Sequence, residues 1–204
     1  MRLYVHELSG HSHRARLFAS LLGLDVEIVR VDLGAGEHKT PAFLAKNPLG
    51  QVPVLEDGEL TLGDSNAINV YLASRYDARA QWYPDAPEAR ARIQRWLSIA
   101  AGEIKNGPAD ARLVNVFGAK LDHERAKQIA TRVLGLLEAE LQRGAFLVGE
   151  RATLADVAVY SYVAHAPEGD VSLEPYPAVR GWLARVEALP GFVPMKRTAA
   201  GLAA

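Results

Sequence analysis

The sequence contains no cysteine. This absence excludes disulfide bonds, thiolate metal sites and a nucleophilic thiol that belongs to the protein itself. Any sulfur chemistry must therefore use a thiol that a ligand brings. Charge of one sign is also lacking, because 23 Lys and Arg residues stand against 24 Asp and Glu residues. This balance does not provide the positive field that favours nucleic acid or an anionic membrane, so neither partner is expected.

Long apolar runs are absent too. No run approaches the ~18 residues of a membrane span, and the start, MRLYVH, is too short and too polar for a signal peptide. We therefore expect a soluble, cytoplasmic protein. The sequence has no G-x-S-x-G motif, which argues against a serine hydrolase. His6, His11 and His13 lack a carboxylate or thiolate at metal-motif spacing, so no metal site is expected.

The first part of the chain predicts alternating strands and helices. Leu3 and Val5 alternate with polar residues and predict a short strand, and apolar residues at helical spacing predict a helix over 13–23 that ends at Gly23. Residues 26–32 predict a second strand, parallel to the first. Pro41 begins a short helix through residue 46, and 52–55 and 59–62 predict a hairpin around the turn at 57–58. A further helix begins at 64–66, which completes the order β-α-β-α-β-β-α over residues 1–76.

The second part predicts helices almost exclusively. We assign a first domain to 1–77, a linker rich in Pro and Asp to 78–87, and an all-helical domain to 88–204. The predicted helices cover 88–105, 108–118, 122–142, 153–165 and 176–188. Thr153 and Asp156 have the spacing of a capping box, which favours a structural role for this acid over a catalytic one. Trp96 and Trp182 are predicted to lie in the core.

Val52-Pro53 is expected to interrupt the hydrogen bonding between strands, because proline has no N–H to donate. We refer to this dipeptide as the Val52-Pro53 corner. If the bond is cis, the backbone of Val52 can turn outward and offer its N–H and C=O to an extended peptide. An ordinary trans proline at a strand end is the alternative, and the sequence leaves both open.

Asp64-Ser65 begins the last helix of the first domain. A helix N-terminus exposes free N–H groups and carries about half a positive charge. The Ser65 amide and hydroxyl suit a ligand carboxylate, and Asp64 suits a ligand ammonium, so the pair fits a γ-glutamyl group. The alternative is that both residues only cap the helix.

The loop Ser9-Gly10-His11-Ser12 offers hydroxyl groups at the start of the first helix, and Arg14 and Arg16 follow closely. A hydroxyl donor, a helix dipole and positive charge all favour the thiolate form of a bound thiol. Ser9 is the first candidate donor and Ser12 the second, although either serine can instead cap the helix.

Two stretches, NPLGQVPVLEDG at 47–58 and LGDSNAI at 62–68, resemble the glutathione-site core of the cytosolic glutathione transferases. The stretch TLADVA at 153–158 resembles the helix-capping segment of that family's C-terminal domain. The similarity in element order covers essentially the whole chain and points to a bacterial, serine-type member, similar to the beta, zeta and nu classes. It implies a thioredoxin-like N-terminal domain with a mixed sheet, followed by an all-α C-terminal domain.

The resemblance also implies roles for individual residues. Pro53 would be cis, Val52 would pair with the cysteinyl backbone of glutathione, and Asp64 and Ser65 would hold its γ-glutamyl end. His38, Lys39 and Gln51 match positions that reach the glycyl end or the peptide backbone. Ser9 matches the hydroxyl donor. His11 departs from the asparagine or cysteine that relatives often have there, so it is a second candidate for activating the thiol.

The favoured function is that of a detoxification enzyme, a glutathione S-transferase that ionises glutathione as co-substrate and joins its sulfur to a small electrophile. The alternatives are a glutathione-dependent disulfide or peroxide reductase and a non-catalytic glutathione-transferase-like binding protein. The family implies a homodimer. The second-substrate pocket is predicted near residues 103–112, with the late loop 165–168 as a further candidate; its predicted residues are Glu103, Ile104, Asn106, Pro108 and Arg112.

Overall fold

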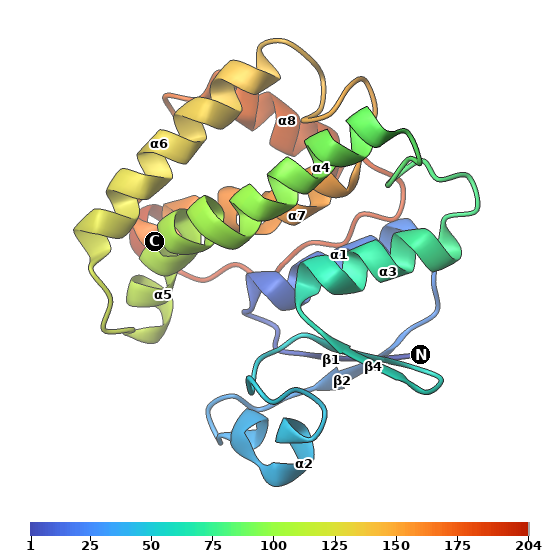
Figure 1. Cartoon of the computed structure of the whole chain (residues 1–204). Helices are drawn as coiled ribbons and strands as arrows, with labels where there is room; N and C mark the ends of the chain where they lie inside the picture. Colours follow the sequence, from blue (N-terminus) through green and yellow to red (C-terminus); the bar gives the residue numbers. More distant parts are fainter. Residues whose placement is uncertain (204) are drawn as a thin grey trace. The chain divides into compact units, whose positions relative to one another are not determined.

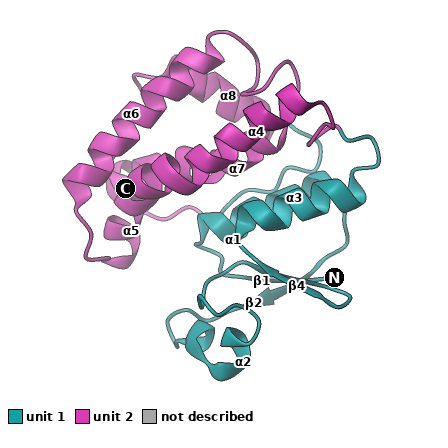
Figure 2. Cartoon of the chain, viewed as in Figure 1, with its two compact units in different colours: residues 1–80, 189–196 teal, residues 81–188, 197–204 magenta. Residues whose placement is uncertain are grey.

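The computed structural model describes residues 1–203 and divides the chain into two compact units, coloured separately in Figure 2. Unit 1 comprises residues 1–80 and 189–196, and unit 2 comprises residues 81–188 and 197–204. The first boundary lies within the predicted linker. The segment 189–196 was expected in the helical domain but belongs to unit 1.

Unit 1 follows the predicted element order (Figure 1). Its elements are β1 (Arg2–Val5), α1 (Gly10–Leu21), β2 (Glu27–Arg30), a 3₁₀ turn (Glu37–Lys39), α2 (Pro41–Leu44), β3 (Val54–Asp57), β4 (Leu60–Gly63) and α3 (Ser65–Tyr76). The strands lie in the order β2-β1-β3-β4. β1 pairs in parallel with β2, and the other pairs are antiparallel, so the sheet is mixed as expected.

The two faces of the sheet are covered differently. Figure 1 shows α1 and α3 side by side on one face and α2 on the opposite side. Leu3 and Val5 of β1 are buried, whereas Tyr4 points the other way and contacts Phe43 of α2 edge-on. This alternation is what a strand between two apolar layers requires.

The helix α1 begins at Gly10, three residues earlier than predicted. The Ser9 side chain caps it by accepting a hydrogen bond from the Ser12 N–H at 3.2 Å. Gly10 and Ser12 of the first turn are buried but carry no apolar side chain, so apolar periodicity predicted a later start.

The segment 189–196 is held to α1 and to the end of β1 by hydrogen bonds within unit 1. The Ser20 hydroxyl donates to the Gly191 carbonyl at 2.7 Å, and His13 Nε2 lies 2.8 Å from the Val193 carbonyl. Lys196 forms an ion pair with Glu7 at 3.0 Å. These partners lie far away in the sequence, which explains why local patterns did not assign the segment to this unit.

All the regular secondary structure that is described in unit 2 is helical. Its elements are α4 (Pro87–Ile99), a π-helical segment (Ala100–Ala109), α5 (Asp110–Phe117), α6 (His123–Leu141), α7 (Leu154–Ala164), a 3₁₀ turn (Ala166–Gly169), α8 (Pro177–Glu187) and a final 3₁₀ turn (Gly201–Ala203). The predicted break between helices at 105–108 is wrong, because residues 87–117 form one continuous helical path. Pro108 lies within the π-helical segment, whose wider turns accommodate a residue without an N–H.

The helix α7 is the centre of unit 2, since every residue from Leu154 to Ala164 is buried. Thr153 and Asp156 form the predicted capping box at its start. Trp96 and Trp182 are 1% and 0% exposed, which confirms their assignment to the core. Across residues 1–203, no helix has both the length and the apolar character needed to span a membrane. The same residues contain no group of three or more potential metal ligands.

Candidate active site

The start of α3 combines an unusual backbone with an unengaged amide. Asp64 has φ of 69°, a region that non-glycine residues seldom occupy and that is enriched at functional sites. Its Oδ1 accepts hydrogen bonds from the Asn66 and Ala67 N–H groups, both at 2.9 Å. Within residues 1–203 the Ser65 N–H donates to no acceptor, so this turn keeps a donor for a ligand.

A buried arginine donates hydrogen bonds to this turn. Arg14 of α1 is 1% exposed, and its Nη1 donates to the Ser65 hydroxyl at 2.9 Å and to Asn66 Oδ1 at 3.0 Å. A buried guanidinium adds positive charge to the positive end of the α3 dipole, which favours an anion there. The sequence pattern placed Arg14 near the thiol and did not indicate this contact with Ser65 and Asn66. The available signal was its position one turn before Leu17 and Phe18, on the buried face of the helix.

The same group of side chains orients His11. His11 Nδ1 lies 3.4 Å from the Ser65 hydroxyl and 3.5 Å from Arg14 Nη1. A guanidinium only donates, so Nδ1 is the acceptor in the contact with Arg14. The two contacts hold the His11 ring beside the start of α3.

The two serines of this loop have different surroundings. Ser9 is half-buried, and although its oxygen accepts the Ser12 N–H, its own proton remains available for donation. Ser12 is 1% exposed, and its oxygen accepts the His6 N–H at 3.1 Å. Ser12 thus fixes the loop between β1 and α1, while Ser9 stands at its accessible edge.

The Val52-Pro53 corner has the form that the resemblance implied. The bond is cis. The Val52 side chain packs against the cluster of Val31, Phe43 and Val54. Its backbone N–H and C=O make no hydrogen bond in the part of the chain that the structure describes. They are therefore free to pair with an extended ligand.

The neighbouring turns are tied to this corner. The Asn47 side-chain amide donates to the Gln51 carbonyl at 2.9 Å, and Lys39 Nζ lies 3.5 Å from the Gly50 carbonyl. A Cβ at Gly50 would lie only 2.8 Å from the His38 carbonyl, so the two turns approach closely. His38, Lys39 and Gln51 are thereby brought together, and the buried Nδ1 of His38 has no hydrogen-bond partner among residues 1–203.

The residues predicted for the second-substrate pocket lie in unit 2 and divide into two groups. Glu103 and Asn106 are exposed on the π-helical segment. Ile104, Pro108 and Arg112 are buried. Only the first pair offers polar side chains to solvent.

Arg112 belongs to a buried charge cluster that also contains the predicted late-loop residues. Its Nε donates to Glu168 at 2.6 Å, and His165 Nδ1 lies 2.7 Å from the other Glu168 oxygen. Burial lowers the pKa of His165 below its usual value, although Glu168 acts in the opposite direction. Burial also acts to raise the pKa of Glu168, but His165, the Thr198 N–H and Arg112 outweigh it and hold that pKa below its usual value. The charges of this cluster are thus paired inside unit 2.

Family models match both parts of the chain. The model described as "Glutathione S-transferase, N-terminal domain" matches residues 1–74, and "Glutathione S-transferase, C-terminal domain" matches residues 111–190. Glutathione S-transferase 3 of Zea mays is 32% identical, with 94% of this chain and 91% of that protein covered. Glutathione S-transferase theta-2 of Homo sapiens is also 32% identical, with 94% and 82% covered.

The solved structures agree with these sequence matches. The crystal structure of a glutathione S-transferase from Pseudomonas fluorescens superposes with a TM-score of 0.88 at 33% identity. The superposition covers 96% of this chain and 98% of that one. The thioredoxin-like domain and the helical domain are thus both present here.

Proposed function

Because the chain belongs to the glutathione S-transferase family and is a glutathione transferase, we propose that it activates glutathione at the loop of Ser9 and His11. Glutathione is the co-substrate, and its sulfur is transferred to a small electrophile. The observation that supports this assignment is the open start of α3, where Arg14 holds Ser65 and orients His11.

The tripeptide lies across the Val52-Pro53 corner in this proposal. Its γ-glutamyl carboxylate accepts the Ser65 N–H, and its ammonium pairs with the exposed Asp64 carboxylate. The Val52 backbone pairs with the cysteinyl residue, which lies as an added strand at the end of β3. His38, Lys39 and Gln51 bind the glycyl end, because they are gathered beside Gly50.

Two donors then act on the sulfur. Ser9 donates its hydroxyl proton and His11 donates a ring proton, and both stabilise the thiolate. A free thiol with a pKa of ~8.5 is mostly protonated at neutral pH, and lowering it by two units requires about 2.7 kcal/mol. One or two hydrogen bonds to a charged acceptor, each worth about 1.5–3 kcal/mol, supply this. Ser12 holds the loop in place.

We propose the finer assignments from the family resemblance. The chain is a serine-type transferase similar to the beta, zeta and nu classes, acts in detoxification in the cytoplasm, and works as a homodimer. Glu103 and Asn106 contact the electrophile, while Ile104, Pro108 and Arg112 support the helix that carries them.

Substitution of the two donors tests the proposal. Ser9→Ala is expected to lower kcat/KM for a chloronitroaromatic substrate by about tenfold or more, and His11→Ala by a smaller factor. The pH profile of each variant should show a raised thiol pKa. Ser172→Ala is the matched control, because its hydroxyl serves only the local turn at Glu174. Unchanged rates and pH profiles in both donor variants would refute thiol activation by this loop.

A further inference from the structure

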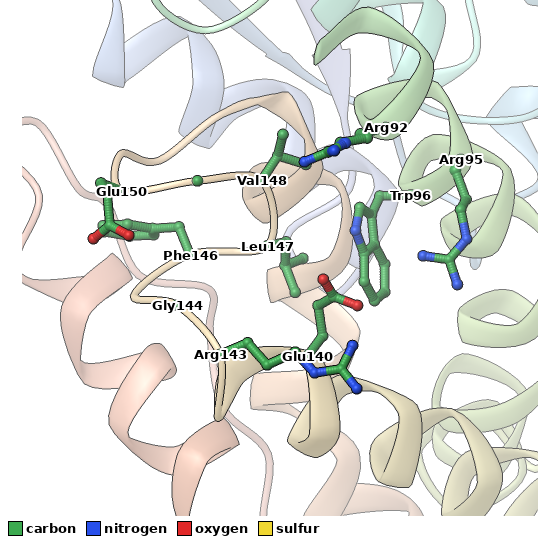
Figure 3. Close-up of a pocket in the computed structure, with 11 residues that line it drawn as sticks. Arg92, Arg95, Trp96, Glu140, Arg143, Gly144, Phe146, Leu147, Val148 and Glu150 are labelled. Atoms are coloured by element: carbon green, nitrogen blue, oxygen red, sulfur yellow. The ribbon is translucent and has the colours of Figure 1, made fainter. Parts of the chain in front are cut away.

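Unit 2 contains a hollow of about 280 Å³ that shares no residue with the glutathione site proposed above. It is lined by α4, by the end of α6 and by the loop 144–150 that follows α6 (Figure 3). A hollow of this size accommodates a small organic molecule.

Three guanidinium groups surround the hollow. Arg92 and Arg95 come from α4, and Arg143 follows α6. Figure 3 shows Arg92 extending to the loop at Val148, with Arg95 beside the Trp96 ring. None of the three forms an ion pair within residues 1–203, although exposed arginines elsewhere do, such as Arg90 with Asp85. These cations are therefore available to a ligand anion.

Hydrogen-bond donors without acceptors accompany the cations. Trp96 is 1% exposed and lines the hollow, yet its Nε1–H donates to no acceptor among the described residues. The backbone N–H groups of Val148, Gly149 and Glu150 also make no hydrogen bond there. A ligand oxygen in the hollow can accept a hydrogen bond from the Trp96 indole.

We propose that this hollow binds a small carboxylate with an aromatic or branched apolar body. Glu140 and Glu150 also line it, so three arginines and two glutamates give a formal charge of +1. One carboxylate neutralises that charge, whereas a phosphate dianion would leave the hollow with a net negative charge. Phe146, Leu147 and Val148 supply an apolar wall for the body of the ligand. The carboxylate accepts from Trp96 and pairs with the guanidinium groups.

Calorimetry with benzoate tests the proposal. The protein is first saturated with S-methylglutathione, so that the glutathione site is occupied. We expect benzoate to bind with a Kd below about 1 mM, and the uncharged benzamide to bind at least about tenfold more weakly, because one hydrogen bond to a charged group has that effect.

Two substitutions locate the binding. Arg143→Gln should weaken benzoate binding about tenfold. Arg132→Gln should leave it unchanged, because Arg132 is exposed like Arg143 but lies within α6 and does not line the hollow. Both variants are checked for unchanged thermal stability and transferase rate. Equal binding of benzoate and benzamide, equal binding by both variants, or no benzoate uptake would overturn the proposal. Tighter, Arg143-dependent binding of inorganic phosphate would overturn the assigned ligand class.

Discussion

Two helices of this molecule combine an acid and a hydroxyl residue at their start, but in opposite circumstances. Asp64 is the N-cap of α3 and Ser65 its first residue, whereas Thr153 is the N-cap of α7 and Asp156 its third residue. At α7, Asp156 is 1% exposed and accepts from the Leu147 and Thr153 N–H groups and from the Trp182 indole. At α3, Asp64 is exposed in a strained conformation and the Ser65 amide has no acceptor within residues 1–203.

The difference shows that similar capping residues at a helix start can either stabilise the fold or bind a ligand. We call the start of α7 closed, because buried side chains accept hydrogen bonds from its free N–H groups. Such a start stabilises the fold. We call the start of α3 open, because the Ser65 N–H has no acceptor within residues 1–203. Such a start also has the positive potential of the helix dipole, so it can bind an anion at some cost in stability. Residue identity alone does not separate the two, because burial decides which donors a ligand can reach.

The largest expected effect comes from breaking the closed start. Asp156→Ala removes the acceptor of four buried donors, the Leu147 and Thr153 N–H groups, the Thr153 hydroxyl and the Trp182 indole, and should lower the free energy of unfolding by about 3–5 kcal/mol. Chemical denaturation measures this change. Asp156→Asn keeps one oxygen acceptor and should lose less. A loss below about 1 kcal/mol for the alanine variant would show that this cap does not hold unit 2 together.

Changing the open start should affect binding instead. Asp64→Asn keeps the capping oxygen and tolerates a positive φ, but removes the charge that pairs with the ligand ammonium. We expect the KM for glutathione to rise about tenfold, while the free energy of unfolding changes by less than about 0.5 kcal/mol. Steady-state kinetics and denaturation are measured together. Asp25→Asn, another exposed loop aspartate, is the control. A loss of stability without a change in KM would show that Asp64 only caps α3, as Thr153 and Asp156 cap α7.

The other end of α7 extends the comparison to pH, because His165 is its C-cap residue. Its pKa is lowered in the folded protein, so the unfolded chain takes up a proton below about 6.5 that the folded chain resists. Stability should therefore fall as the pH falls below about 6.5, by at most about 1.4 kcal/mol for each pH unit. Thermal unfolding between pH 7.5 and 5.5 measures the slope. His165→Asn should flatten it, and an equally steep slope in this variant would assign the effect to other groups.

The smallest expected effect concerns the hydroxyl of the closed start. Thr153→Ala removes the acceptor of the Ala155 N–H and should cost about 1 kcal/mol of stability. Thr153→Ser keeps that acceptor and should recover most of the loss. Denaturation midpoints of the three proteins give the comparison, and a serine variant as unstable as alanine would assign the effect to the lost methyl group.

The sequence predicted features that depend on local chemistry. Apolar periodicity gave the element order of unit 1, and the spacing of Thr153 and Asp156 gave the capping box. The break expected before Pro108 was wrong, because packing against α6 keeps the helical path continuous there: a Cβ at Gly107 would lie only 2.8 Å from the Ala130 nitrogen. Arg14 and the segment 189–196 were misassigned because their partners are distant in sequence. The roles of the predicted site residues remain predictions.

The segment 189–196 has a consequence for how the protein forms during translation. Its hydrogen bonds to Ser20 and His13 and its ion pair with Glu7 belong to unit 1, although more than a hundred residues of unit 2 precede it. The ribosome must therefore release residue 196 before the first unit acquires all its native contacts. Until then the nascent thioredoxin-like region stays incomplete, and it is exposed to chaperones and proteases while the helical region is still being made.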